Sequence, residues 1–246
     1  MDIFDAHTHI GSYGWEGHRG NFDTPDAAID ELRSCGITRA VTVPWRAVLC
    51  ETEADLDAGN EEALSLRSRF PGFIYPGVVI DFRWPARSLF WLETFRREGL
   101  RWAGELVPKA AEGETPFTHP AWGELFDAVE AAGMLLQLHN TTGTAKVAKA
   151  HPRLQIIGSH LNADVMPDLV DLPNVVLDFS GYCGGLGLHS LDKAREAFGA
   201  RRLLFGTDYD GYDPRPYIMR AKRAFTEEEQ SLVFRENAMR LLEDKA

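Results

Sequence analysis

Two histidines, His7 and His9, stand two residues apart near the front of the chain, directly after the apolar run Ile3–Ala6. Such a run is typical of a β-strand, and side chains on a strand alternate between its two faces. His7 and His9 should therefore point the same way. Two neutral imidazoles that converge on one point suit a divalent transition metal such as zinc. Taken alone, the pair also fits an ordinary strand end with two polar residues.

Further metal-ligand types stand at the ends of later strand-like runs. In chain order they are Glu105, His139, His160 and Asp208, in the fourth, fifth, sixth and eighth runs. In a closed parallel barrel the carboxyl ends of all strands meet at one rim. Carboxylates at the end of an apolar run are costly to desolvate unless a cation or hydrogen-bond donors compensate them. The combination therefore predicts a metal centre at that rim.

Each of these four residues has a structural alternative when it is considered alone. His139 and His160 fit core histidines that hydrogen-bond to the backbone. Asp208 fits a helix cap or a turn, because an Asp-Gly pair follows it. Glu105 fits an ion pair with a nearby basic residue. The agreement of five separate strand ends is what favours the metal.

Eight strand-like runs can hold these residues in place. They are Ile3–Ala6, Ala40–Val43, Phe73–Ile80, Leu100–Leu106, Met134–Leu138, Leu154–Gly158, Val175–Phe179 and Leu203–Gly206. Helical patterns, or loops long enough to hold a helix, separate most of them. The sequence therefore predicts an α/β fold, a distorted, compact single (β/α)8 TIM barrel that forms one domain over residues 1–246. A doubly wound open sheet is the alternative, but it would concentrate the polar residues at one switch point.

Helix signals support this arrangement. Thr24 is a capping residue followed by Pro25 at the first helical position, and Gly36 should end that helix. Near the end of the chain, Thr226 and Glu229 form a capping-box pattern. A last helix should follow, with its apolar face at positions 234, 238 and 241.

Composition limits the partners of the chain. It has 246 residues, a formal net charge of −11 and no block of lysine or arginine, so we do not expect a surface that grips nucleic acid or an anionic membrane. No run approaches the roughly 18 apolar residues of a membrane span, and no secretory leader is apparent. Three cysteines, odd in number and far apart, indicate free thiols and a cytoplasmic protein. We expect a small-molecule substrate, and exposed aromatic loops would also allow a homodimer.

Side chains on the rim loops are candidates for substrate binding. Arg46 and Arg83 follow the second and third strands and can bind a substrate carboxylate, although both also fit exposed loop arginines. Tyr13 and Tyr182 can line a pocket for a modest organic molecule, or they can pack within their own loops. His18, in the first loop, has a weaker claim to touch the substrate.

As a set, these motifs resemble the amidohydrolase superfamily. The resemblance is closest to its amidohydrolase-related branch of metal-dependent hydrolases, lactonases and aminocarboxymuconate-semialdehyde-type decarboxylases. It runs from end to end of the chain, through residues 4–9, His139, residues 158–160, residues 202–208 and residues 235–242. The Gly104-Glu105 end of the fourth strand departs from several decarboxylase-like relatives and resembles TatD-type nucleases and other two-metal members.

The resemblance implies a divalent metal, Zn²⁺ or alternatively Mn²⁺, and it allows two ligand arrangements. With two ions, Glu105 bridges them, His7, His9 and Asp208 complete one site, and His139 and His160 complete the other. With one ion, His7, His9, His139 and Asp208 hold it and His160 polarises the substrate.

The predicted function is a metal-dependent hydrolase, in which a metal-activated water cleaves an ester, lactone or amide bond of a small organic substrate. Asp208 would take the proton of that water and pass it to the leaving group, so Asp208 and His160 are the predicted catalytic residues. Metal-dependent decarboxylation of an unsaturated or aromatic acid is one alternative, and TatD-like phosphodiester cleavage is another. A barrel that keeps a structural metal and only binds a ligand is a further alternative, which the complete ligand set argues against.

Overall fold

Parallel strands form the centre of the structure. A computed structural model describes residues 2–109, 116–181 and 184–243. Its strands are β1 (Ile3–Thr8), β2 (Ile37–Thr42), β3 (Ile74–Pro76), β4 (Trp102–Leu106), β5 (Leu135–His139), β6 (Ile156–Ser159), β7 (Val175–Asp178) and β8 (Leu203–Leu204). They pair in parallel in two sets, β1 to β3 and β4 to β8. Each strand is therefore the neighbour of the next one in the chain.

Backbone pairs at two places join the two sets into a closed barrel. Val78 bridges to Ala103 in β4, with its N–H 2.8 Å from the carbonyl oxygen of Trp102. On the other side Thr8 bridges to Tyr209, just past β8. The predicted (β/α)8 barrel is thus confirmed. The predicted third and eighth strands were too long, because regular strand structure ends at Pro76 and at Leu204.

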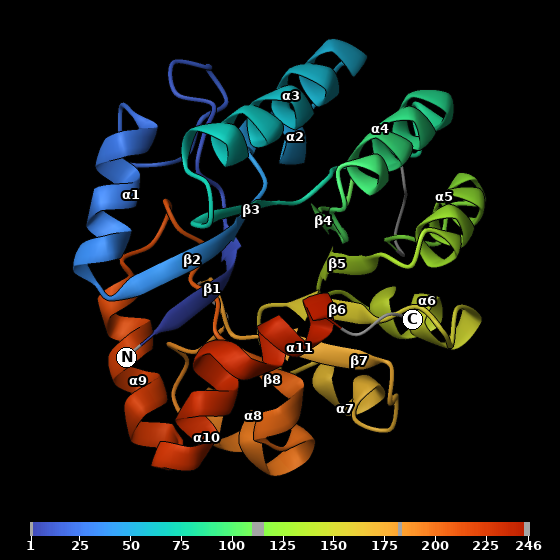
Figure 1. Cartoon of the computed structure of the whole chain (residues 1–246). Coiled ribbons are helices and arrows are strands. Elements are labelled where there is room, and N and C mark those ends of the chain that lie inside the picture. The colour runs from blue at the N-terminus through green and yellow to red at the C-terminus, as the bar shows by residue number, and fades with distance from the viewer. Residues whose placement is uncertain (1, 110–115, 182–183, 244–246) are drawn as a thin grey trace.

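Helices surround the barrel (Figure 1). They are α1 (Pro25–Ser34), α2 (Trp45–Val48), α3 (Glu53–Arg69), α4 (Pro85–Arg97), α5 (Ala121–Ala131), α6 (Thr144–Ala150), α7 (Met166–Leu169), α8 (Ser190–Phe198), the 3₁₀ turn η2 (Ala200–Arg202), α9 (Pro214–Ala224), α10 (Glu227–Ser231), the π-helical turn η3 (Leu232–Glu236) and α11 (Asn237–Glu243). None of the helices in the described part of the chain is both long and apolar enough to cross a membrane.

The predicted helix starts are present. The Thr24 side chain accepts a hydrogen bond from the Ala27 N–H ahead of α1, and Thr226 and Glu229 make a reciprocal capping box at α10. The single last helix that the apolar spacing predicted is instead divided into α10, η3 and α11. The π-helical turn adds a residue to the helical turn there, so a regular 3.6-residue period does not describe the whole segment.

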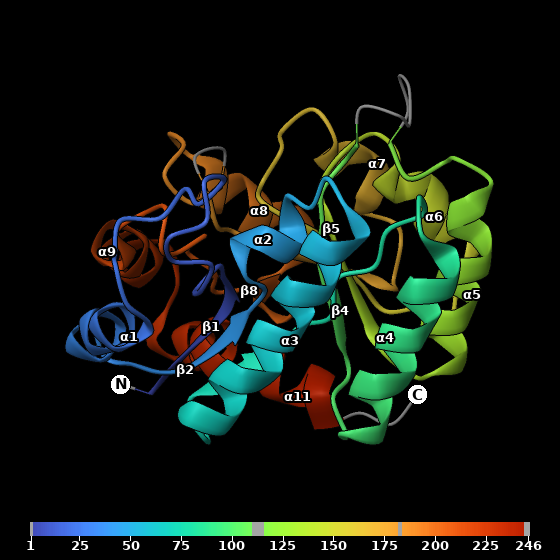
Figure 2. The same ribbon diagram turned by 90° about the horizontal axis from the view of Figure 1, so that it is seen from above.

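Two apolar clusters hold the fold together. The larger one packs the helices against the outside of the strands. The smaller one fills the barrel with one or two side chains from most strands, namely Phe4, Ala6, Val41, Trp102, Leu135, Ile157, Val176 and Leu204. Ala238 and Leu241 of α11 complete this inner cluster. Figure 2 shows α11 at one end of the barrel and α2 with the rim loops at the other. Helix α11 therefore closes the first end of the barrel. The carboxyl ends of the strands lie at the second end.

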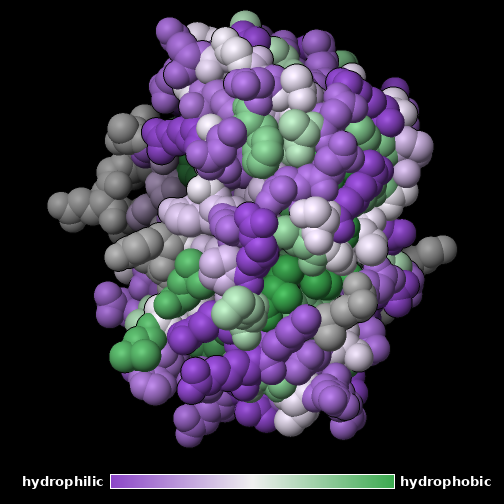
Figure 3. Space-filling view, turned by 90° about the vertical axis from the view of Figure 1, so that its left-hand side faces the viewer, coloured by the Kyte–Doolittle hydropathy of each residue, from purple (hydrophilic) through white to green (hydrophobic). Residues whose placement is uncertain are grey.

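Few large apolar side chains of the described residues remain exposed. Leu188 and Met219 are the most exposed of them, at 80% and 70%. Figure 3 shows the side of the barrel on which α1 and α9 lie, where hydrophilic residues dominate and apolar ones gather toward the centre. The homodimer that the sequence allowed stays a prediction.

Candidate metal centre

Glu105 lies at the centre of the candidate site and faces four imidazoles. Its Oε2 is 3.2 Å from Nε2 of His7 and 3.5 Å from Nε2 of His9. Its Oε1 is 3.1 Å from Nδ1 of His139 and 3.4 Å from Nε2 of His160. Each carboxylate oxygen thus has its own pair of imidazole nitrogens.

Asp208 joins the first of these pairs. Its Oδ1 is 3.1 Å from Nε2 of His9 and 3.9 Å from Nε2 of His7. All six residues named as ligands from the sequence are therefore brought together at the carboxyl ends of the strands. Two sets of ligand atoms lie within 4.8 Å of one another, His7 with His9 and Glu105, and Glu105 with His139 and His160.

Hydrogen bonds on the far side of three rings fix how the imidazoles face the cluster. Nδ1 of His9 lies 2.9 Å from the carbonyl oxygen of Val43, and Nδ1 of His160 lies 2.9 Å from that of Ser180. A carbonyl can only accept, so each Nδ1 carries the proton and each Nε2 offers its lone pair inward. Nδ1 of His7 likewise faces Oδ2 of Asp178, at 3.1 Å. This is the usual arrangement of histidines that hold a metal.

Asp178 is a functional candidate that the sequence analysis missed. It is fully buried at the end of β7 and accepts hydrogen bonds from Gln137 Nε2 at 2.9 Å and from the N–H of Ser180 at 3.0 Å. With His7 and His160 it forms a third set of close ligand atoms. The signal was available, because Asp178 stands near the end of a strand-like run, as Asp208 does.

Three residues of the site have backbone φ angles that are positive. His160 and Asp208 have φ angles of +69° and +63°, a left-handed conformation that non-glycine residues adopt rarely and at some cost. Gly104 has a φ of +100°, and a Cβ there would lie 2.1 Å from the carbonyl oxygen of Gln137. Only glycine therefore fits directly ahead of Glu105.

Opposite charges stabilise one another in this buried cluster. Burial lowers the pKa of His7, but the carboxylates of Glu105 and Asp178 outweigh it and raise that pKa well above its usual value. Burial also opposes the charged form of His9, yet hydrogen bonds with Asp208 and Glu105 raise its pKa to about 9. The pKa of Glu105 is lowered well below its usual value despite burial, because His7, His139 and His160 face it. Without a metal, protons supply the positive charge that these carboxylates need.

The donor set fits a divalent transition metal. Imidazole nitrogens and carboxylate oxygens are the common ligands of zinc, and a coordinating imidazole must be unprotonated. A divalent ion would replace the protons on His7 and His9 as the charge partner of the buried carboxylates. The residues present therefore suit such an ion, at one or both ends of Glu105.

The predicted substrate-binding residues lie elsewhere on the rim or outside the described residues. Arg46 Nε donates to Asp55 at 2.9 Å, and Arg83 donates to both oxygens of Asp81, at 3.0 and 2.8 Å. Both guanidinium groups are thus engaged with carboxylates of this chain. Tyr13 lies half-buried on the first loop, and Tyr182 falls outside the described residues. Substrate binding by these side chains stays a prediction.

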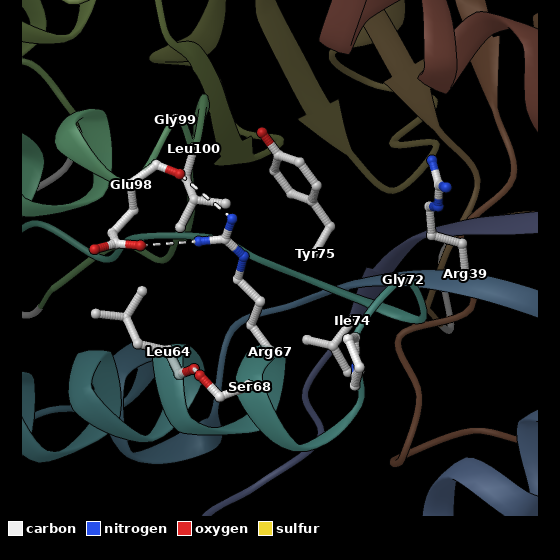
Figure 4. Close-up of a pocket in the computed structure, with 11 residues that line it drawn as sticks. Arg39, Leu64, Arg67, Ser68, Gly72, Ile74, Tyr75, Glu98, Gly99 and Leu100 are labelled. Atoms are coloured by element: carbon white, nitrogen blue, oxygen red, sulfur yellow. Dashed lines mark hydrogen bonds and ion pairs between the residues drawn. The ribbon is translucent and has the colours of Figure 1, made fainter.

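A hollow of about 700 Å³ lies away from the cluster, beside the start of β3 (Figure 4). Its lining includes Arg67, Ile74, Tyr75 and Leu100. Ile74 begins β3 and Leu100 precedes β4, so the hollow is at the amino ends of these strands. The metal-ligand cluster is at the carboxyl ends, where TIM-barrel active sites are found.

The comparisons with known proteins agree with this geometry. Over residues 4–243 the chain matches the family described as amidohydrolase. The protein therefore belongs to the amidohydrolase family, whose TIM-barrel fold it shares. A search of the curated proteins gives no match.

Solved structures resemble the chain along nearly its whole length. An uncharacterized TIM-barrel protein from Bordetella bronchiseptica is 16% identical to this chain with a TM-score of 0.78, and the match covers 98% of both chains. The 2,6-dihydroxybenzoate decarboxylase from Rhizobium is 17% identical with a TM-score of 0.74, again with 98% of both chains covered. A Pseudomonas putida protein named "putative 2-pyrone-4,6-dicarboxylic acid hydrolase" is 19% identical with a TM-score of 0.76, covering 98% of this chain and 97% of that one. Likeness at these identities shows the fold alone.

Proposed function

We propose that this amidohydrolase-family protein is a hydrolase that holds two divalent ions and cleaves an ester, lactone or amide bond of a small organic substrate. The observation that carries the proposal is the division of Glu105 between two pairs of imidazoles, one pair at each carboxylate oxygen. We propose Zn²⁺ as the ion, with Mn²⁺ as the alternative, because imidazole and carboxylate ligands are found with both.

Asp208 is the residue we propose as proton acceptor. Bound ions would lower the pKa of a water from about 15.7 to about 7 and polarise the scissile carbonyl. Burial raises the pKa of Asp208, but the hydrogen bond with His9 and the nearby His7 and His9 imidazoles together outweigh burial and lower the pKa below its usual value. Asp208 is therefore ionised at neutral pH and able to take a proton from the attacking water and return it to the leaving group.

Exposure supports the assignment of roles within the cluster. The side chain of Asp208 is 15% exposed, against 3% for Glu105. His139 is the most open of the imidazoles, with 43% of its side chain exposed. We propose that the substrate approaches from the side of His139 and Asp208, while Glu105 holds the ions from beneath. His160, which faces Glu105 through Nε2, is proposed as a ligand of the second ion.

An activity screen tests the proposal. The purified full chain is stripped with a chelator and reloaded with zinc or manganese, then offered lactones, esters, amides, phosphodiesters and unsaturated or aromatic carboxylic acids. We expect metal-dependent hydrolysis of a carbonyl substrate. Release of carbon dioxide from the acids would instead establish a decarboxylase, and cleavage confined to phosphodiesters would establish the TatD-like alternative. Either outcome would overturn the proposal.

A further inference from the structure

Gln137 is a buried polar side chain that the proposed chemistry does not use. It stands in the middle of β5, two residues before His139, and is 1% exposed. Burying an amide costs free energy unless its oxygen and its nitrogen both find hydrogen-bond partners. The partners of Gln137 therefore indicate why a glutamine stands at this position.

Trp102 determines which way the amide of Gln137 faces. The indole Nε1 of Trp102, in β4, donates to Oε1 of Gln137 at 2.8 Å. An indole nitrogen can only donate a hydrogen bond, so the atom of Gln137 that it meets is the carbonyl oxygen. Trp102 is fully buried and packs in the inner apolar cluster. The core of the barrel thus directs the amide nitrogen of Gln137 away from Trp102.

That nitrogen faces Asp178 and His7. Nε2 of Gln137 donates to Oδ2 of Asp178 at 2.9 Å and lies 3.3 Å from Nδ1 of His7. Nδ1 of His7 is itself 3.1 Å from the same Oδ2. A carboxylate oxygen only accepts hydrogen bonds, so the two N–H groups converge on it. The proton of His7 is thereby held on Nδ1, which leaves Nε2 for an ion.

The other oxygen of Asp178 is held by the backbone that follows β6 and β7. Oδ1 accepts from the N–H of Ser180 at 3.0 Å, from the N–H of His160 at 3.2 Å and from the hydroxyl of Ser180. An ionised carboxylate has about four lone-pair positions, and these donors together with Gln137 and His7 fill them. Asp178 therefore acts as a hydrogen-bond acceptor behind His7.

We propose that Gln137 is a positioning residue for the metal centre. It fixes Oδ2 of Asp178, which in turn orients the ring of His7 toward the ion beside Oε2 of Glu105. Because Gln137 contacts Oδ2 and does not contact Oδ1, its effect is confined to the ion that His7 holds. This inference rests on the proposed divalent ion at His7, but it does not depend on which reaction the protein catalyses.

Zinc affinity tests this role without requiring turnover. The full chain is stripped of metal, and its zinc affinities are measured by competition with a chromogenic chelator. Gln137→Met keeps the length of the side chain but cannot donate, and we expect it to weaken binding of one zinc ion about tenfold. Gln155→Met is the matched control, because Gln155 donates to the carbonyl oxygen of Asn174 at 2.9 Å, just before β6 and away from the cluster. It should keep the wild-type affinities.

A double-variant comparison shows whether Gln137 acts through Asp178. Residues that act through one another are not additive, so adding Gln137→Met to Asp178→Asn should weaken zinc binding by less than about twofold further. Thermal unfolding of the metal-free proteins checks that each variant is folded. Gln137→Asn, which keeps an amide but shortens its reach, takes the place of Gln137→Met if that variant does not fold, with the same result expected.

The outcomes separate this inference from the proposed function. Wild-type zinc affinity in folded Gln137→Met would overturn the positioning role. Equal weakening of two ions, or a full tenfold loss that persists beside Asp178→Asn, would also overturn it, because either result indicates a general structural effect. Absence of hydrolysis, with the weaker zinc binding and its dependence on Asp178 intact, would overturn the hydrolase and leave the role of Gln137 standing.

Discussion

Asp178 lies behind His7, with its Oδ2 3.1 Å from Nδ1 of the imidazole, on the opposite side of the ring from Glu105. A carboxylate in this place orients the ring and makes its inward nitrogen a better ligand. We predict that Asp178→Asn weakens zinc binding by about 10- to 100-fold, measured by competition with a chromogenic chelator. Asp192→Asn, an exposed carboxylate outside the cluster, should leave zinc affinity unchanged. Equal affinities of Asp178→Asn and wild type would show that Asp178 does not support the ligand.

Asp208 should matter for turnover more than for metal retention. In Asp208→Asn the side chain keeps its size but can no longer accept a proton. We expect kcat to fall by about 10²- to 10⁴-fold in whichever hydrolysis assay is positive, while metal analysis shows that His7, His9 and Glu105 still retain ions. Full turnover by this variant would remove Asp208 from the proposed proton transfer.

Protons and metal ions should compete for the same imidazoles. Without metal, the cluster raises the pKa of His9 from 6.5 to about 9, the carboxylates outweighing the effect of burial. A raised histidine pKa stabilises the folded state below the unfolded value of 6.5, and this contribution is lost as the pH rises through about 9. Metal affinity rises over the same range, because fewer protons must be displaced.

Calorimetric unfolding checks the direction of this pH dependence. The difference in Tm between zinc-loaded and chelator-treated protein should grow as the pH rises from 6.5 toward 9. Substituting His9 with glutamine should flatten the pH dependence of the chelator-treated form. A difference that shrinks with rising pH would contradict the assignment of these imidazoles as ligands.

The plug at the closed end of the barrel should stabilise the fold independently of the site. Leu241 of α11 is 3% exposed and packs in the inner cluster with side chains such as Phe4 and Leu204. We expect Leu241→Ala to lower the free energy of unfolding by about 2–5 kcal/mol, as is usual for large-to-small core substitutions. The exposed Met219 gives a control. Met219→Ala should change the free energy of unfolding by less than about 0.5 kcal/mol. Denaturant unfolding of both variants makes the comparison, and equal values would mean that α11 does not plug the barrel.

The sequence predicted the parts of the site that follow from topology. His7 lies on β1 with His9 directly after it, His139 ends β5, and His160 and Asp208 follow β6 and β8. A closed parallel barrel must therefore bring these residues to one rim. The fold itself followed from the count and order of the apolar runs. Asp178, at the end of β7, obeys the same rule but was not among the predicted ligands, and its side chain lies behind His7.

Sequence patterns could not predict the contacts between loops. For example, the guanidinium group of Arg83 donates hydrogen bonds to both carboxylate oxygens of Asp81, two residues away. The approach of His18 to Asp210 joins loops far apart in the chain. Such contacts depend on loop conformation, which neither hydrophobic period nor capping signals determine.

Metal content measured by mass spectrometry tests whether Glu105 holds two ions. Full-length protein is stripped, loaded with excess zinc and desalted, in parallel with Glu105→Gln and with the exposed control Glu98→Gln. We predict two zinc ions per chain in the wild type and in Glu98→Gln, and one or fewer in Glu105→Gln. A single ion per chain in all three proteins, or none in the wild type, would contradict a centre built around Glu105.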